Sequence, residues 1–333
     1  MPKEKTTGNF NGAGGAKQKT AVILQEPQTN AKVLADLKAF LEKNGYTVHV
    51  LDSDHKNHFK AVELVKQAPR EKSICYIAGS AEGNDPELVS AAKDLAEKVV
   101  KAGFNTVYPG SGKGMMGAIC DAVKDAGGKI TSVFSLQVAE AHFEEITTDA
   151  DSIVVAPNEK VRQLMYHLLS GAQIALPGGT GTYAESTVHF YQNTQIGLIY
   201  RHPDNFGPEN YPSPIIYFSP ETEAVKEEYK KLLCKKFYPD NPAMQKAIMK
   251  ADIKAGYWDF AKLAYDNLID LGFSSRDFHA FIKNHETAEE VIKQLQSWDD
   301  PKVRKMLVNL INAHNRKTRD GFSHIVGHDF KVD

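Results

Sequence analysis

Short apolar runs alternate with longer amphipathic segments along most of this chain. At the start, apolar runs at 21–24 and 46–51 flank a segment at 30–44 whose apolar residues recur with helical spacing, which predicts strand, helix, strand. The alternation continues with strands at 74–78, 106–108, 129–134, 152–155, 173–176 and 214–218, and helices at 57–67, 86–102, 115–126, 158–170, 182–193, 224–235, 242–255, 259–271 and 288–298. Such alternation predicts an α/β fold with a doubly wound, Rossmann-like parallel sheet.

The same pattern predicts how the chain is divided. Residues 1–19 are polar and glycine-rich and are expected to form a flexible tail. Residues 20–70 hold the first β-α-β unit, which would extend the core sheet or form a small separate lobe, with Pro69 and the charges at 70–72 marking the join. Residues 71–298 are expected to form a nucleotide-binding catalytic core with an insertion at about 201–256, and 299–333 a last helix and a tail.

Composition excludes several classes of function. The 333 residues are 42% hydrophobic and 25% charged with a net charge of -2, an ordinary globular balance that gives no electrostatic case for a nucleic-acid partner. No apolar run approaches the ~20 residues of a membrane span. Cys75, Cys120 and Cys234 lack C-x-x-C spacing, so neither a metal site nor a disulfide framework is expected. We therefore expect a cytoplasmic protein with reduced cysteines.

Candidate chemistry begins where the strand at 173–176 ends. The following Pro177-Gly178-Gly179-Thr180-Gly181-Thr182 is a glycine-rich turn that leads into a helix, and the free N–H groups of a first helical turn attract a phosphate. Glu185 lies one turn inside the helix, close to such a ligand. Thr182-x-x-Glu185 also fits a capping box, in which the glutamate only bonds back to the cap. The candidate phosphate-binding residues are Gly178, Gly179, Thr180, Gly181 and Thr182.

A second glycine loop, Gly112-x-Gly114-x-x-Gly117, follows the strand at 106–108. A dinucleotide enzyme would place an acidic residue about 20 positions later, at the end of the next strand, where this chain has Phe134-Ser135-Leu136. The Walker pattern fails as well, so a mononucleotide is favoured over a dinucleotide. Further substrate-binding candidates at these strand ends are Gly79, Ser80, Gly110, Gly112, Gly114 and Met115.

These motifs together resemble the Lonely Guy (LOG) family of nucleoside 5'-monophosphate phosphoribohydrolases. The family motif P-G-G-x-G-T-x-x-E matches the run from Pro177 to Glu185 at every fixed position, and the family's upstream arginine falls on Arg162. The resemblance covers about 73–199 and implies hydrolysis of a purine or cytokinin-type nucleoside 5'-monophosphate without metal or cofactor. It also implies Arg162 and Glu185 as catalytic residues and a homodimer.

Two positions depart from the family pattern. A lysine and a glutamate of the family are replaced by Gln163 and Ala184, which indicates a retuned pocket, since Arg162 and Glu185 are kept. The same departures favour the alternative, a non-catalytic protein that binds or senses a nucleotide on this fold. A third alternative, a DNA-processing protein on a related scaffold, is disfavoured by the charge balance.

Overall fold

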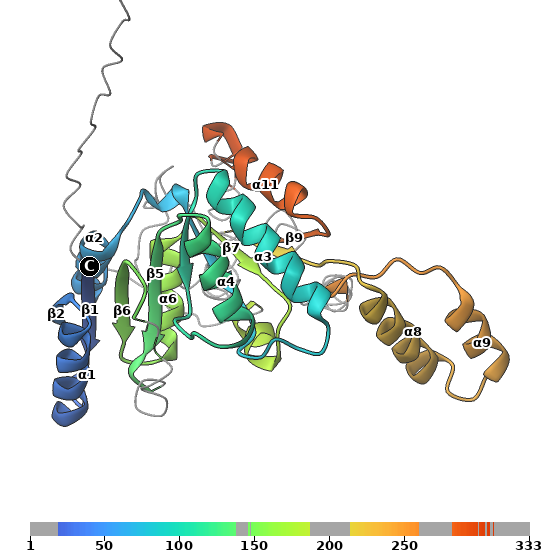
Figure 1. Cartoon of the computed structure of the whole chain (residues 1–333), viewed down its shortest axis with the longest axis horizontal. Helices are drawn as coiled ribbons and strands as arrows, with labels where there is room; N and C mark the ends of the chain where they lie inside the picture. The colour runs from blue at the N-terminus through green and yellow to red at the C-terminus, as the bar shows by residue number, and fades with distance from the viewer. Residues whose placement is uncertain are drawn as a thin grey trace, which may run out of the picture.

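The nine strands of the described part of the chain form one parallel sheet (Figure 1). The structure is a computed structural model and describes residues 19–137, 146, 148–186, 214–259, 282–298, 300–303, 305–306 and 309. The strand order is β2-β1-β6-β5-β4-β3-β7-β8-β9. The strands are β1 (Lys19–Gln25), β2 (Tyr46–Asp52), β3 (Ser73–Ile77), β4 (Asn105–Tyr108), β5 (Ile130–Ser135), β6 (Ser152–Ala156), β7 (Ala172–Ala175), β8 (Ile215–Phe218) and β9 (Ile282–His285).

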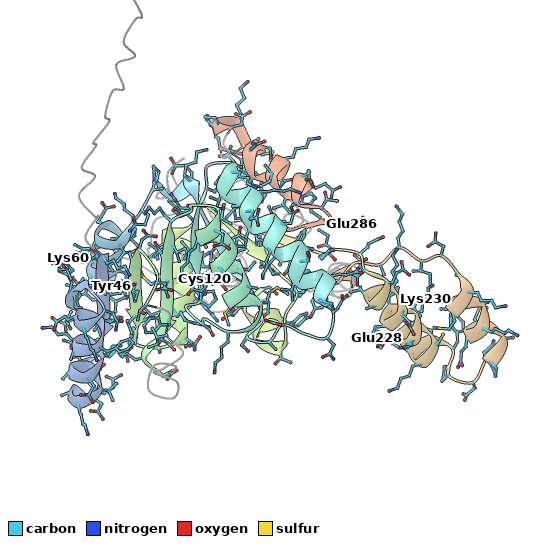
Figure 2. All side chains as sticks on the ribbon, in the orientation of Figure 1. Tyr46, Lys60, Cys120, Glu228, Lys230 and Glu286 are labelled. Carbon is cyan, nitrogen blue, oxygen red and sulfur yellow. The ribbon has the colours of Figure 1, made fainter. Side chains whose placement is uncertain are left out.

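The N-terminal β-α-β unit extends the core sheet. Strand β1 pairs with β6 in parallel, with Thr20 opposite Ser152, so of the two expected arrangements the continuous sheet is the one observed. At this seam the Tyr46 hydroxyl lies within hydrogen-bond distance of the backbone carbonyls of Thr148 (2.8 Å) and Ala150 (2.6 Å) (Figure 2). Tyr46 therefore ties the N-terminal unit to the polypeptide that leads into β6.

Helices cover both faces of the sheet because alternate strand residues point to opposite sides. In β1, Ala21 and Ile23 belong to one apolar cluster, to which α1, α3, α4 and α11 contribute. Val22 and Leu24 belong to the other, which α2 and α6 complete. These helices are α1 (Ala31–Lys43), α2 (His55–Val65), α3 (Pro86–Lys101), α4 (Gly114–Asp125), α6 (Glu159–Leu169) and α11 (Ala288–Ser297).

Chain order reverses between β3 and β7. From β3 the chain proceeds outward through β4, β5 and β6, and then returns to place β7 on the other side of β3. In open α/β sheets a crevice forms at the carboxyl ends of the strands where the order reverses, and ligands bind there. The loop after β3, with the predicted residues Gly79 and Ser80, therefore meets the glycine turn after β7 at one place.

Three details differ from the sequence-based expectation. Strand β9 was not predicted, because Ile282-Lys283-Asn284-His285 has a single apolar residue and forms a strand only through its pairing with β8. Helix α9 (Pro242–Lys250) ends five residues earlier than expected, with Ala251 already extended. The helix predicted to begin at Thr182 is helical from residue 180 onward.

Other predictions fall partly or wholly outside the described residues. These are most of the tail at 1–19, the helix beyond 186, the insertion before 214, the helix at 260–271 and the end of the chain beyond 309. The last helix is supported where it is described, since residues 301–303, 305–306 and 309 are helical.

A helical hairpin projects from the sheet at the end nearest β8 and β9 (Figure 1). It is formed by α8 (Glu223–Phe237) and α9, which pack against each other. Figure 2 shows Lys230 on the projecting hairpin, whereas Glu228 of the same helix lines a cavity together with Gly178 and Trp258. Within the described residues, none of the helices is both long and apolar enough to cross a membrane.

Candidate functional site

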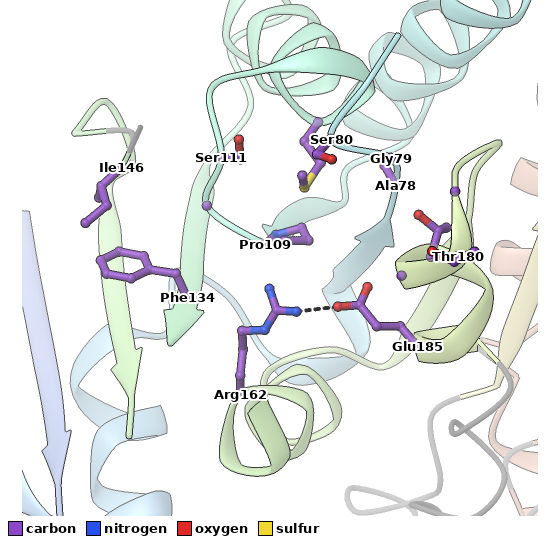
Figure 3. A pocket seen from close by; sticks show the side chains of 15 residues that line it. Ala78, Gly79, Ser80, Pro109, Ser111, Phe134, Ile146, Arg162, Thr180 and Glu185 are labelled. Atoms are coloured by element: carbon purple, nitrogen blue, oxygen red, sulfur yellow. Dashed lines mark hydrogen bonds and ion pairs between the residues drawn. The ribbon is translucent and has the colours of Figure 1, made fainter. Parts of the chain in front are cut away.

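A cavity of about 430 Å³ lies at the carboxyl ends of β3, β4 and β7, where the chain order reverses. The loops after these strands supply seven of its fifteen lining residues, and α4, β5, Ile146, α6 and the helix over 180–186 supply the remainder (Figure 3). Nine of the thirteen predicted site residues line it: Gly79, Ser80, Gly110, Arg162, Gly179, Thr180, Gly181, Thr182 and Glu185.

The helix that carries Glu185 opens toward this cavity with unused backbone donors. Its first intrahelical bond runs from the Tyr183 N–H to the Gly179 carbonyl (3.0 Å). Among the described residues no acceptor faces the N–H groups of Thr180, Gly181 and Thr182. Such donors at a helix N-terminus, together with the helix dipole, favour an anion.

The structure rules out the capping-box interpretation of Glu185. In a capping box the threonine is the residue before the helix and the glutamate is its third residue. Here Gly179 occupies the cap position, and Thr182 is a buried residue inside the first turn. The Glu185 carboxylate bonds instead to the guanidinium of Arg162.

Arg162 joins two carboxylates beside the cavity. It lies one turn into α6, whose first turn is capped by the Asn158 side chain. Its Nη2 donates to Glu185 and to Glu159, the latter at 2.7 Å, and Glu159 also accepts from the Ser135 hydroxyl at 2.6 Å. The Arg162 and Glu185 side chains are only 12% and 13% exposed, and both point into the cavity (Figure 3). A buried, bonded pair of this kind has a fixed geometry, unlike a surface ion pair.

The environment shifts the pKa of both partners. Burial raises the pKa of Glu185 above its usual range, and Arg162 opposes this shift while Glu159 adds to it. Burial lowers the pKa of Arg162, but Tyr166, Glu185 and Glu159 together outweigh that effect and raise it. Arg162 therefore stays charged, and Glu185 is a more basic carboxylate than one in water.

The side of the cavity away from the helix at 180–186 is apolar. Phe134, at the end of β5, and Ile146 lie together on this side (Figure 3), and Pro109 and Met116 also line the cavity. Phe134 occupies the strand end at which a dinucleotide enzyme would have its ribose-binding acid. The cavity thus has a donor-rich end, an apolar end, and an arginine–carboxylate pair with access to both.

Four predicted residues, Gly112, Gly114, Met115 and Gly178, do not line the cavity. Gly114 and Gly178 are positions at which backbones meet: a Cβ on Gly114 would collide with the Ser80 carbonyl, and one on Gly178 would lie 2.8 Å from the Gly79 nitrogen, whereas a Cβ on Gly112 would meet nothing within 4 Å. Met115 is buried in the core. The N–H groups of Met115 and Met116 bond to the carbonyls of Ala81 (3.3 Å) and Gly79 (3.2 Å). The second glycine loop thus supports the loop after β3, and its predicted contact with a ligand stays a prediction.

Several lining residues were not predicted. The strand-end rule that selected Gly79 and Ser80 applies equally to Phe134, and would have found it. Ile146 is placed by a bridge to Ser111, and no local pattern signals that pairing. The lining residues that the motifs did not select are Ala78, Pro109, Ser111, Met116, Phe134 and Ile146.

The described residues contain no group of three or more histidine, cysteine or carboxylate side chains that could hold a metal. Cys75, Cys120 and Cys234 are buried free thiols.

The part of the chain that forms this cavity is similar to a known protein family. The model of the SLOG cluster4 family matches residues 72–228, a range that includes both glycine loops, Arg162 and Glu185. The resemblance to the LOG family is confirmed.

Curated LOG relatives match over part of their length. The LOG-like segment is 32% identical over 131 residues to the probable cytokinin riboside 5'-monophosphate phosphoribohydrolase LOG4 of Oryza sativa subsp. japonica, covering 39% of this chain and 56% of the relative. It is 28% identical over 197 residues to LOGL3 of the same organism, a probable enzyme of the same name, covering 58% of this chain and 89% of that protein. This chain thus spans little more than half of the first of these relatives.

Among solved structures, the molybdenum cofactor carrier protein MCP of Chlamydomonas reinhardtii is 14% identical, with a TM-score of 0.38, and covers 69% of this chain and 98% of its own.

Proposed function

We propose that this protein hydrolyses the N-glycosidic bond of a purine or cytokinin-type nucleoside 5'-monophosphate, releasing the free base and ribose 5-phosphate. The observation that carries the proposal is the buried Arg162–Glu185 pair in a cavity that has backbone donors at one end and an apolar wall at the other. The names of the matched relatives support the same reaction class.

The two ends of the cavity suit the two ends of a nucleotide. The N–H groups of Thr180, Gly181 and Thr182 would bind the 5'-phosphate, while Phe134 and Ile146 offer an apolar surface to the base. A cavity of about 430 Å³ falls in the usual range for small-molecule sites, ~300 to 1,000 Å³. This orientation would bring the ribose next to Glu185.

Glu185 would act on the anomeric carbon. Cleavage of the N-glycosidic bond leaves positive charge on the ribose ring as the bond's electron pair departs with the base. A carboxylate at that point stabilises the cation and accepts a proton from the attacking water, whose oxygen forms the new bond to carbon. The departing base takes up one proton, so the reaction consumes one water. Arg162 would keep Glu185 ionised and correctly oriented.

A non-catalytic nucleotide-binding protein is the second candidate. It is favoured by Gln163 and Ala184, which replace a charged residue each in the family pattern. Neither Gln163 nor Ala184 lines the cavity. The two charges of the family pattern are therefore missing near the cavity and not from its wall. Binding without turnover would follow if the reaction needs those charges.

Base release separates the two candidates. The purified protein would be incubated with a panel of nucleoside 5'-monophosphates and with the matching nucleosides, and free base would be measured by chromatography. We expect release from the monophosphates and far less from the nucleosides, because binding of the remote phosphate helps position the reacting carbon.

Glu185→Gln is the matched control for this assay. It keeps the shape of the side chain and removes the charge, so turnover should fall about a hundred- to thousandfold, the usual effect of losing a central electrostatic group, while nucleotide binding persists. Nucleotide binding by the wild type with no base release from any substrate would favour the sensing alternative.

A further inference from the structure

A short segment from outside the family match holds the glycine turn in place. Residues 256–259, with the sequence Gly-Tyr-Trp-Asp, follow the α8–α9 hairpin, whereas the family model ends at 228. Tyr257 reaches the turn after β7, which supplies Gly179 to the cavity wall. We call residues 256–259 the clip.

The clip is fixed to the ends of β7 and β8. The Trp258 backbone N–H donates to the Ser219 hydroxyl at 2.7 Å, and its indole N–H donates to the Ala175 carbonyl at 3.1 Å. Gly256 packs so closely that a Cβ there would collide with Ser219. The Asp259 carboxylate accepts from the Gly256 N–H at 2.8 Å and closes the segment on itself. The clip therefore has a defined position relative to the turn.

One hydroxyl satisfies both backbone polar groups of Gly178. The Tyr257 O–H donates to the Gly178 carbonyl, and its oxygen accepts from the Gly178 N–H at 3.2 Å. A phenol can donate one hydrogen bond and accept another at the same time. Gly178 has no space for a side chain, since a Cβ would meet Thr182 and the Gly79 nitrogen. The backbone at Gly178 is therefore held by Tyr257 on one side and confined by Thr182 and Gly79 on the other.

The orientation of the next peptide follows from that contact. In a trans peptide the carbonyl of one residue and the N–H of the next point in opposite directions. Tyr257 and Gly178 line a second cavity, of about 920 Å³, on the other side of the turn, and neither of them lines the cavity that holds Arg162 and Glu185. With its carbonyl held by Tyr257, Gly178 would turn the N–H of Gly179, which lines both cavities, toward the first one.

We propose that Tyr257 is a positioning residue for phosphate binding: its hydroxyl sets the peptide between Gly178 and Gly179 so that the Gly179 N–H joins those of Thr180, Gly181 and Thr182 as an anion donor. This inference rests on the proposed function for the nature of the anion. Tyr257 acts through the backbone and does not touch the substrate.

The test compares binding of ribose 5-phosphate with binding of adenosine by isothermal titration calorimetry. Ribose 5-phosphate carries the phosphate but has no base to lose, so its binding is measured without turnover. Tyr257→Phe removes only the hydroxyl and leaves the Gly178 groups unsatisfied. We expect it to weaken ribose 5-phosphate binding by about five- to fiftyfold, the range for one or two unsatisfied polar groups, and to change adenosine binding less than twofold.

Tyr238→Phe is the matched control, because Tyr238 lies at the end of α8 on the projecting hairpin. It should bind both ligands as the wild type does. Equal ribose 5-phosphate affinity in Tyr257→Phe and the wild type would overturn the proposal, as would an equal loss for both ligands. If Tyr257→Phe does not fold, Trp258→Phe loosens the clip by removing the bond to Ala175 and should weaken ribose 5-phosphate selectively.

The outcome for Tyr257 is separable from the outcome for catalysis. Ribose 5-phosphate binding that depends on Tyr257, with no base release from any monophosphate, would retain the positioning role and reject the hydrolase. A wild type that does not bind ribose 5-phosphate would overturn the positioning role, while base release is judged by its own assay.

Discussion

Glu159 changes the interpretation of the Arg162–Glu185 pair. The motif predicted the pair, but not the second carboxylate that Arg162 also bonds one helical turn earlier. One arginine thus faces two carboxylates, and the buried Glu185 has its pKa raised by burial and by Glu159 against the opposing effect of Arg162. The pH dependence of the site is consequently set by three residues.

The raised pKa of Glu185 should be visible in the pH dependence of turnover. If turnover needs ionised Glu185, activity is present above its pKa and is lost as the pH falls through it. Because the pKa is raised from its ordinary 4.5, the acid limb of kcat/KM should lie above pH 4.5. Glu159→Gln removes a negative charge that raises this pKa, so the acid limb should move to lower pH.

The control for this shift is Glu289→Gln. Glu289 is an exposed carboxylate on α11 that pairs with Lys98, far along the chain from the cavity lining, and its replacement should leave the pH profile unchanged. An acid limb that stays in place in Glu159→Gln would show that Glu159 does not influence the group that titrates.

At the scale of elements, two glycines of one turn have different roles. Gly178 lies where a Cβ would meet Thr182 and Gly79, whereas a Cβ on Gly181 would meet nothing within 4 Å. Gly178→Ala should therefore lower the free energy of unfolding by about 1 to 3 kcal/mol, the usual cost of overpacking. Gly181→Ala should leave stability unchanged or slightly higher.

The Gly181→Ala variant should instead be impaired in ligand binding. Gly181 lines the cavity, so its new methyl group should obstruct the phosphate and weaken nucleotide binding in a protein that melts normally. Urea unfolding and nucleotide titration of both variants check the prediction. Equal stability losses in the two variants would mean that the backbone contact between Gly178 and Gly79 is not tight.

The sequence predicted the elements whose patterns are local. Strands such as β1 and helices such as α1 with its Asn30 cap follow from apolar periodicity and capping residues, and the two glycine turns follow from composition. Elements that depend on pairing could not be predicted: β9 has one apolar residue and exists through β8. The helix start at 180 was missed because Thr182-x-x-Glu185 imitates a cap signal three residues after the actual cap, Gly179.

The site shows the same distinction. Arg162 and Glu185 were found by motif, while Tyr257 was not, because nothing in its local sequence signals a bond to a turn 79 positions earlier. Ile146 likewise depends on its bridge to Ser111. Contacts between distant segments complete the cavity, and these are set by the topology of the sheet.

At the scale of the whole molecule, the apolar character of α6 has an internal explanation. Met165, Tyr166 and Leu169 are buried in the cluster between α6, α2 and the sheet, with Val161 and Leu168 packed against it. A helix with this many apolar residues is usually buried on more than one side. Because the sheet and α2 bury most of its apolar residues, α6 alone no longer requires a partner.

The surface that stays apolar lies on the α8–α9 hairpin instead. Leu232, Phe237, Tyr238, Met244 and Met249 are five of the eight large hydrophobic residues exposed in the described part of the chain. Residues 223–250 carry seven lysines and four carboxylates, a net charge of +3, whereas the whole chain has -2 and the remainder therefore -5. A basic, apolar hairpin is complementary in charge to the remainder of a second copy.

We therefore propose a homodimer in which this hairpin contacts the second copy. Light scattering at micromolar concentration should give twice the monomer mass of 36.8 kDa. Phe237, 61% exposed, would be buried in such a contact, so Phe237→Lys should shift the mass toward the monomer without changing the melting of the fold. Phe59→Lys, at an exposed aromatic residue on α2, is the control and should remain dimeric.

Moderate salt should weaken the association because screening reduces charge complementarity. A wild-type particle at the monomer mass with full activity would exclude the dimer as a requirement for catalysis, and a dimer unaffected by Phe237→Lys would place the interface elsewhere.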